Sequence, residues 1–232
     1  MIAGGDQPAG RPRAVRIGPL PAMRAVVFDV GETLVDETRA WNEAAAAAGV
    51  TPFTLMAAIG ALIERGRDHR EVWRLLAAPA PGAPSLTTAD LYPDALPCLR
   101  AARAAGLVVG IAGNQPAGAE SRLREAGFDA DFIASSAGWG VEKPSAAFFA
   151  RVVQEAGVPC DQILYVGDRV DNDVVAASAA GLRSAFLRRG PWGHLQAGLP
   201  GAGTADLRLA SLHELELLMR ATDPPGDAEA RG

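Results

Sequence analysis

Two short apolar runs of this chain each lead into a carboxylate, and this feature constrains the fold more than any other. The first run, 25–28, ends at Asp29, and the second, 163–166, ends two residues before Asp168, with Asp173 a little further on. Apolar runs of this length are typical of buried strands. In open α/β sheets the carboxyl ends of parallel strands carry the binding site. Because grouped carboxylates repel one another, a bound cation is needed to offset that repulsion. The runs therefore predict a metal-dependent carboxylate site at the edge of a parallel sheet.

Strand and helix patterns alternate along most of the chain. Glycines follow several of the helical patterns, as at Gly106, Gly127 and Gly181, and glycine commonly ends a helix. This alternation predicts an α/β fold with a doubly wound, Rossmann-like parallel sheet and right-handed crossovers. The predicted strands cover 25–28, 107–112, 132–134, 163–166, 184–187 and 206–210, and the predicted helices cover 94–105, 120–126, 146–156, 173–180 and 212–219.

One long helical stretch interrupts the alternation directly after the first predicted strand. Apolar residues recur at three- and four-residue spacings through 36–78, and the proline-rich stretch 79–84 then breaks the pattern. No strand pattern separates these helices. We therefore expect a small helical insertion, 36–90, within a core made of 23–35 and 91–221.

The composition limits the partners that the chain can have. Its 232 residues are 49% hydrophobic, which is enough for one domain with a packed core. The net charge of −5 gives no basic surface for nucleic acid or an anionic membrane, so we expect a small-molecule partner. Two cysteines without metal-type spacing, and no apolar stretch near the ~18 residues of a membrane span, favour the cytoplasm.

The two ends of the chain differ from the rest in composition. Residues 1–22 are rich in Gly, Pro and Arg and lack the apolar segment of a secretory signal, and Pro and Gly also recur in 222–232. We expect both ends to be flexible, with Met23 as an alternative start.

Four motifs in a fixed order carry a resemblance to a known family. They are Asp29 after the first strand, Gly113-Asn114 after another apolar strand, Lys143-Pro144 after a helix-sized gap, and Gly167-Asp168 with Asp173. In this order and spacing they resemble the haloacid dehalogenase superfamily, from about Met23 to Leu218. The flanking segments 91–94 and 141–149 match as well. The resemblance implies a hydrolase core, a helical cap over the active site and Mg²⁺ as the cofactor.

The resemblance also implies a role for each motif residue. Asp29 would be the nucleophile, since a carboxylate can attack phosphorus to form an acyl phosphate that water then cleaves. Asp29, Asp168 and Asp173 would hold Mg²⁺ through hard oxygen ligands, together with the backbone carbonyl of Gly31. Lys143 would pair with the nucleophile and with a phosphate oxygen, and would stabilise charge in the transition state.

The second motif would bind the substrate. Asn114 and the backbone amides around Gly113 would donate hydrogen bonds to the transferring group. Two structural alternatives stay open, because an asparagine before Gln115-Pro116 is also an ordinary turn residue, and Asp173 could simply favour the N-terminus of the following helix.

Two motif positions depart from the family's pattern. Most phosphatases of the superfamily carry a second Asp two residues after the nucleophile, which protonates the leaving alkoxide and activates water, but that position is Gly31 here. The Ser or Thr that usually precedes the asparagine is Gly113. Glu32 and Asp36 are nearby substitutes for the missing acid. The insertion is also short, and a homo-oligomer could cover the opening that it leaves.

Three hypotheses about function follow. The first is a Mg²⁺-dependent phosphatase of a small phosphorylated metabolite that works through an aspartyl phosphate. The second is a 2-haloacid dehalogenase-like hydrolase, because a halide leaving group needs no proton. That displacement needs no magnesium either, so the acidic pair Asp168 and Asp173 argues against it. The third is a catalytically weak member that binds a phosphometabolite or a protein. Since Asp29 and Lys143 occur together with the acidic pair, the phosphatase is favoured.

Overall fold

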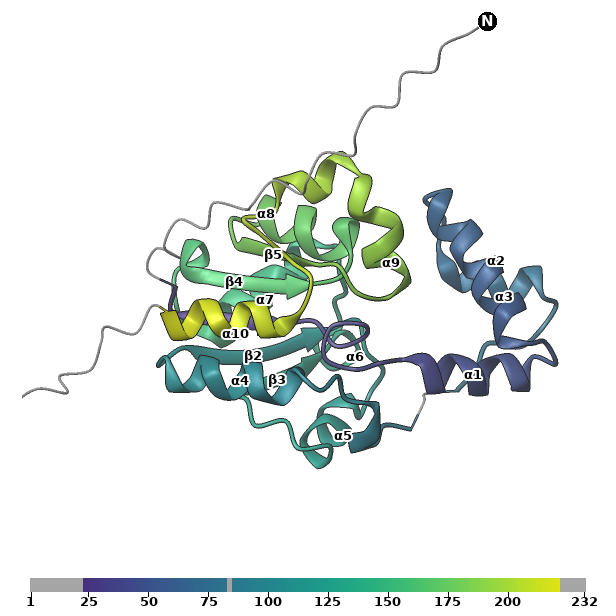
Figure 1. Cartoon of the computed structure of the whole chain (residues 1–232), viewed down its shortest axis with the longest axis horizontal. Coiled ribbons are helices and arrows are strands. Elements are labelled where there is room, and N and C mark those ends of the chain that lie inside the picture. Colours follow the sequence, from purple (N-terminus) through teal and green to yellow (C-terminus); the bar gives the residue numbers. More distant parts are fainter. Residues whose placement is uncertain (1–22, 83–84, 222–232) are drawn as a thin grey trace, which may run out of the picture.

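Six parallel strands form a single sheet in the computed structural model, which describes residues 23–82 and 85–221 (Figure 1). The order of the strands is β3-β2-β1-β4-β5-β6, and every neighbouring pair is parallel. The direction of winding reverses between β1 and β4, which confirms the predicted doubly wound, Rossmann-like fold. The strands are β1 (Ala25–Phe28), β2 (Val108–Gly113), β3 (Phe132–Ser135), β4 (Ile163–Gly167), β5 (Arg183–Leu187) and β6 (Leu207–Leu209).

Helices cover both faces of this sheet (Figure 1). Strand β1 shows how the sequence produces the two layers, because its side chains alternate between two apolar cores. Val26 and Phe28 belong to one core, whereas Ala25 and Val27 belong to the other, and none of the four is more than 1% exposed. The first core includes side chains of α4 (Ala95–Ala104), α5 (Ala119–Glu125) and α10 (Leu212–Ala221), and the second includes side chains of α7 (Ala146–Ala156) and α8 (Ala176–Ala179).

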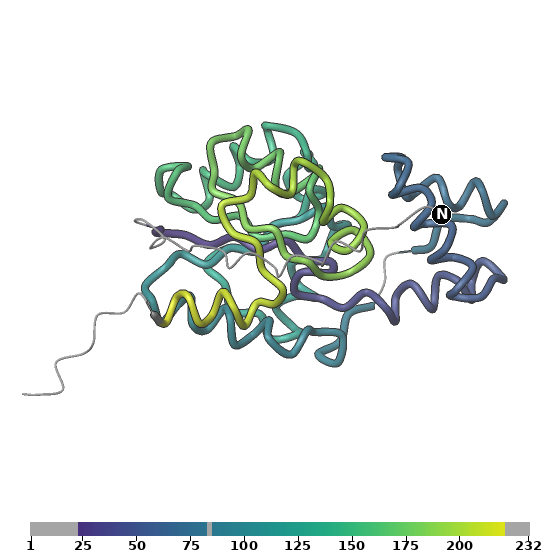
Figure 2. Tube along the Cα trace, turned by 45° about the horizontal axis from the view of Figure 1, so that its top comes forward, coloured from purple at the N-terminus to yellow at the C-terminus, as the bar shows by residue number. Residues whose placement is uncertain are grey.

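The segment between β1 and α4 is helical and lies beyond the carboxyl ends of the strands (Figures 1 and 2). Thr51 caps one of its helices by accepting a hydrogen bond from the amide of Thr54, and Pro52 takes the first helical position. The buried side chains of this segment form an apolar core that includes Trp192 of α9 (Gly190–Leu195). The elements are α1 (Thr38–Ala47), α2 (Pro52–Glu64), a 3₁₀ turn (His69–Glu71), α3 (Val72–Leu75) and a second 3₁₀ turn (Thr88–Asp90).

Several short elements lie where the sequence patterns predict none. The expected helix 173–180 begins earlier, as a π-helical turn (Val170–Val175) that continues into α8. The helix α6 (Ser136–Trp139) depends on one capping hydrogen bond, from the amide of Gly138 to the hydroxyl of Ser135, rather than on apolar periodicity. Helix α9 is likewise unpredicted, as are 3₁₀ turns at Cys160–Gln162, Gln196–Gly198 and Pro200–Thr204.

Two further observations bear on the predictions for the chain ends and for membranes. The predictions for 1–22 and 222–232 concern segments outside the residues that the structure describes.

Within the described ranges no single helix has the length and apolar character needed to cross a membrane. The pair α1 and α2, bent by 106° at the break between them, meets that test jointly by length and composition alone.

Candidate active site

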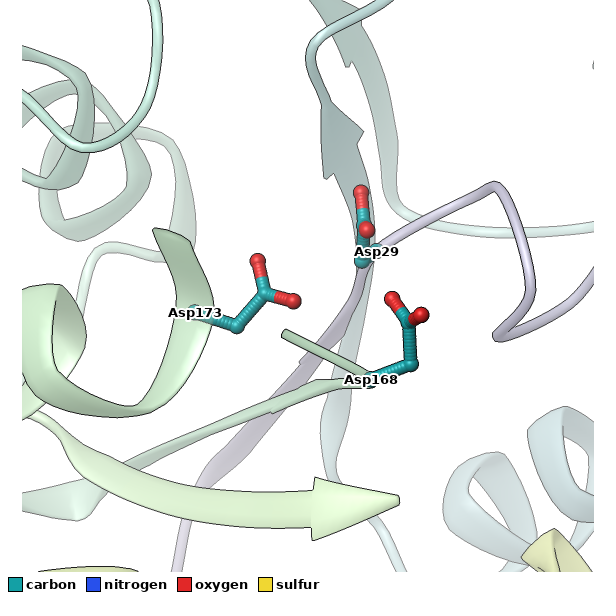
Figure 3. A group of neighbouring side chains, drawn as sticks. All are labelled: Asp29, Asp168 and Asp173. Carbon is teal, nitrogen blue, oxygen red and sulfur yellow. The ribbon is translucent and has the colours of Figure 1, made fainter. Parts of the chain in front are cut away.

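Three carboxylates meet where the winding of the sheet reverses. The register pairs Phe28 of β1 with Val166 of β4, so Asp29 and Asp168 emerge side by side at the same edge. Asp173 reaches them from the π-helical turn, and Figure 3 shows the three side chains gathered around one point. One oxygen from each lies within 4.8 Å of the others. All three are buried, with exposed fractions of 7%, 2% and 1% for Asp29, Asp168 and Asp173.

Lys143, the only lysine in the chain, neutralises part of this acidic cluster. Its Nζ lies 2.7 Å from Oδ1 of Asp29 and 2.7 Å from Oδ1 of Asp173. The ammonium also lies 5.5 Å from the ring centre of Tyr165, a buried residue of β4. Burial disfavours the charged ammonium, but the carboxylates of Asp173 and Asp29 outweigh that effect and hold the pKa of Lys143 well above its usual value. The lysine is therefore a fixed positive charge within the cluster.

Asn114 holds the backbone of Lys143 in place. Its Nδ2 donates to the carbonyl of Lys143 at 2.9 Å, and its Oδ1 accepts from the amide of Lys143 at 2.8 Å. The contacts seen for this side chain are thus with the lysine loop, and a hydrogen bond from Asn114 to a substrate stays a prediction. The structure assigns the asparagine a positioning role that its place in a turn did not indicate.

Gly113 leaves room for the carboxylate of Asp29. A Cβ atom at this position would lie 2.5 Å from Oδ1 of Asp29, which is closer than non-bonded carbon and oxygen atoms approach each other. The same Oδ1 is the atom that pairs with Lys143. The carboxylate of Asp29 would therefore have to shift if position 113 carried a serine or threonine, which gives the glycine at this position a steric explanation.

The acidic cluster also has the donor set that a hard divalent cation requires. Oδ2 of Asp168 is buried and has no hydrogen-bond partner among the described residues. Burial, followed by the neighbouring carboxylates of Asp173 and Asp29, raises the pKa of Asp168 well above its usual value. A buried carboxylate left unsatisfied among like charges is destabilising on its own, whereas an ion such as Mg²⁺ binds through such oxygens. Asp29, Asp168 and Asp173 therefore fit the predicted metal site.

The other departure from the family's pattern, Gly31, lies beside a carboxylate that the sequence analysis did not single out. A Cβ atom at Gly31 would lie 2.6 Å from Oε1 of Glu37, so Glu37 occupies the space of the missing side chain. Trp41 donates from Nε1 to Oε2 of Glu37 at 3.3 Å. Burial, and then the carboxylates of Glu32 and Asp29, raise the pKa of Glu37 to about 7. Glu37 directly precedes α1, and only the folding of the loop brings it back beside Gly31.

Glu32 and Asp36 were expected to replace the acid that is missing at position 31, but neither has a free carboxylate in the cleft. Glu32 accepts from the hydroxyl of Tyr92 at 2.6 Å through Oε2, and from the amide of Glu37 at 3.1 Å through Oε1. Asp36 accepts from the amide of Thr38 at 2.9 Å and lines a separate, smaller cavity. Glu32 therefore holds the loop that carries Glu37, and Asp36 caps the start of α1.

A cleft of about 800 Å³ opens above the acidic cluster, within the range of small-molecule sites. Asp29, Lys143 and Asp168 are among its lining residues. Other lining side chains come from the insertion and from α9, and no sequence motif marked them. These include Trp41, the segment Arg67–Arg70 and Trp192, together with Arg169 from the loop after β4.

Comparison with known proteins decides the family. The model of the haloacid dehalogenase-like hydrolases matches residues 23–181, more than half of the chain. This chain belongs to that family of hydrolases. The resemblance inferred from the four motifs is thereby confirmed.

Two curated relatives of this hydrolase are named as phosphatases. It is 33% identical over 104 residues to the glyceraldehyde 3-phosphate phosphatase of Methanopyrus kandleri, covering 44% of this chain and 45% of the relative. It is 38% identical over 112 residues to the phosphoglycolate phosphatase of Rhodospirillum rubrum, covering 47% and 45%. The alignments thus span less than half the length of these relatives.

Solved structures extend the likeness to nearly the whole chain. The L-2-haloacid dehalogenase of Xanthobacter autotrophicus superposes with a TM-score of 0.61 at 22% identity, covering 87% of this hydrolase and 100% of the dehalogenase. At this level of identity the likeness concerns the fold alone.

Proposed function

We propose that this hydrolase is a Mg²⁺-dependent phosphatase that cleaves small phosphorylated metabolites through an aspartyl phosphate on Asp29. The observation that carries the proposal is the buried cluster of Asp29, Asp168 and Asp173, in which the buried Oδ2 of Asp168 has no hydrogen-bond partner among the described residues. The names of the two phosphatase relatives support the same chemistry. A cleft of about 800 Å³ suits a small ester.

Each residue of the cluster has a distinct role in the proposed reaction. Lys143 pairs with Oδ1 of Asp29, which leaves Oδ2 to attack the phosphorus. The same ammonium stabilises the charge that develops on the phosphoryl oxygens. Asp168 and Asp173 would hold the cation together with Asp29, and a bound Mg²⁺ would supply positive charge that offsets the charge of the phosphate dianion. Asn114 keeps the lysine loop in position.

A second candidate, 2-haloacid dehalogenation, is favoured by Gly31 and by the fold likeness to a haloacid dehalogenase. A halide leaves without a proton, so the absence of an acid at position 31 would be harmless. The paired acids Asp168 and Asp173 weigh against it, because displacement of a halide by a carboxylate needs no cation. The phosphatase therefore remains the better-supported function.

One screen separates the two candidates. Phosphate release is measured from a panel of small phosphate monoesters with Mg²⁺ and with EDTA, and halide release is measured from 2-haloacids. We expect phosphate release that requires Mg²⁺ and is lost in Asp29→Asn, while the exposed-site control Asp129→Asn stays active. Halide release without phosphate release, or full phosphatase activity in EDTA, would reject the proposal.

A further inference from the structure

Hydrolysis of an alkyl phosphate requires a proton for its leaving oxygen, because an alkoxide is a poor leaving group. The cleft contains few carboxyl groups that could supply it. Asp29 and Asp168 belong to the acidic cluster. Glu32 is bound by Tyr92 and by the amide of Glu37. Because of these contacts, the carboxyl groups of Asp29, Asp168 and Glu32 are poorly suited to donate the proton.

The remaining acids of the cleft differ in whether an arginine already holds them. Asp68 is 2.8 Å from Nη2 of Arg70, and Asp171 is 2.6 Å from Nη2 of Arg169. Glu142 is exposed to solvent. With Glu32 set aside, Glu37 is the only partly buried acid among the described residues that line the cleft whose partner is neither an arginine, a lysine nor the acidic cluster.

Glu37 lines the same cleft as the nucleophile candidate Asp29. Its carboxylate fills the space next to Gly31, two residues beyond Asp29, so it stands over the loop from which the nucleophile projects. Oε2 accepts from Trp41, whereas Oε1 has no hydrogen-bond partner within the described part of the chain. The hydrogen bond from the amide of Glu37 to Glu32 fixes the start of α1 in this place.

We propose that Glu37 is the general acid and base of this site, and the proposal rests on the phosphatase function argued above. In the first step an oxygen of Asp29 bonds to phosphorus as the ester P–O bond breaks, and the proton of the Glu37 carboxyl passes to the leaving oxygen to give the alcohol. In the second step Glu37 takes a proton from the attacking water. The water oxygen bonds to phosphorus, the bond from phosphorus to Asp29 breaks, and inorganic phosphate leaves with Glu37 protonated again.

The decisive test compares leaving groups in Glu37→Gln, which keeps the shape of the side chain but has no acidic proton. The rate of the phosphorylation step is measured in single turnovers with an alkyl phosphate and with 4-nitrophenyl phosphate, whose leaving group needs little protonation. We expect a fall of about 10²–10⁴-fold for the alkyl ester and a much smaller fall for the aryl ester. Glu43→Gln makes the same substitution at an exposed site on α1 and should leave both rates unchanged.

A rescue variant tests the geometry itself. Glu37→Ala empties the space beside Gly31, and Gly31→Asp combined with Glu37→Ala returns a carboxyl to it. We expect the double variant to hydrolyse the alkyl ester at least about tenfold faster than Glu37→Ala alone, a modest part of what general acid–base catalysis supplies. If Glu37→Gln does not fold by circular dichroism, this pair carries the test.

The outcomes separate the inference from the function beneath it. Equal losses on both esters, or a wild-type alkyl rate in Glu37→Gln, or no rescue in a folded double variant, would overturn the role of Glu37 while phosphatase activity that depends on Asp29 still stands. Absence of Mg²⁺-dependent phosphate release from the wild-type chain would instead overturn the phosphatase proposal, and the role of Glu37 with it.

Discussion

On the sheet side of the cleft the polar groups are held by strand ends and by backbone contacts, whereas on the insertion side they are held by one another. Asp29 and Asp168 occupy fixed positions because β1 and β4 are neighbours in register. Glu37 depends on a chain of hydrogen bonds through Glu32 to Tyr92, far away in sequence. The difference teaches that the proposed site for the phosphoryl group is part of the sheet, while the proposed site for the leaving group depends on how the insertion is joined to it.

The largest effect is expected on the sheet side, from Lys143→Met. The substitution leaves the buried carboxylates of Asp29 and Asp173 without their cation, and breaking a buried ion pair in this way costs about 3–5 kcal/mol. We expect that loss in the free energy of unfolding, measured by urea titration in EDTA, together with a fall of about 10²–10³-fold in phosphate release. Arg124→Met removes an exposed cation and is the control. A stable and active Lys143→Met would show that the cluster does not depend on its lysine.

The next effect sharpens the metal assignment on the same side. A cation that binds only the folded chain stabilises it by about 2.7 kcal/mol at a concentration 100-fold above its Kd. We expect Mg²⁺ to raise the melting temperature of the wild-type chain and to have little effect on Asp168→Asn, which loses the unpartnered oxygen. Differential scanning calorimetry with and without Mg²⁺ measures both shifts. Equal shifts in the two proteins would place the cation elsewhere.

A smaller effect is expected where the two sides meet, from the single substitution Gly31→Asp. The backbone at Gly31 does not have a positive φ, so the obstacle is the carboxylate of Glu37, 2.6 Å from the new Cβ position. Overpacking of this kind costs about 1–3 kcal/mol, and the two carboxylates would also repel each other. We expect lower stability and no gain in activity. The contrary result, faster hydrolysis of an alkyl ester with no loss of stability, would mean that Glu37 moves aside freely.

The smallest effect concerns the joint of the insertion. Asp90 accepts hydrogen bonds from Nε and Nη2 of Arg39 at 2.8 and 2.7 Å, which ties α1 to the end of the insertion. The guanidinium of Arg39 holds the pKa of Asp90 well below its usual value. A lowered pKa stabilises the folded chain above the unfolded pKa of about 4, and the stabilisation is lost as the pH falls below it. We expect Asp90→Asn to lower the melting temperature by about 2–4 °C at pH 7, and by less at pH 3. A difference that does not depend on pH would contradict the pairing.

The contrast between the sheet side and the insertion side of the cleft also explains how much could be predicted from the sequence. Strand runs and helix periodicity indicated the doubly wound sheet, and topology alone brought Asp29 and Asp168 to one edge. The approach of Lys143 followed from its motif, but the bracing of its backbone by Asn114 depends on two loops that are 29 residues apart and have no shared pattern. Glu37 was missed because its position depends on a left-handed turn at Glu32, with φ of 51°, which a glutamate seldom adopts and no local signal marks.

The apolar contact between the insertion and Trp192 has a consequence for how substrate reaches the site. Trp192 is only 6% exposed, and its ring lies edge-on to that of His69 with their centres 5.0 Å apart. Swinging the insertion away from the sheet would expose this ring and the leucine and isoleucine side chains around it to water, at about 25 cal/mol for each Å² of apolar surface. This apolar contact therefore opposes movement of the insertion away from the sheet, which favours cleft walls that are already in place when a substrate binds.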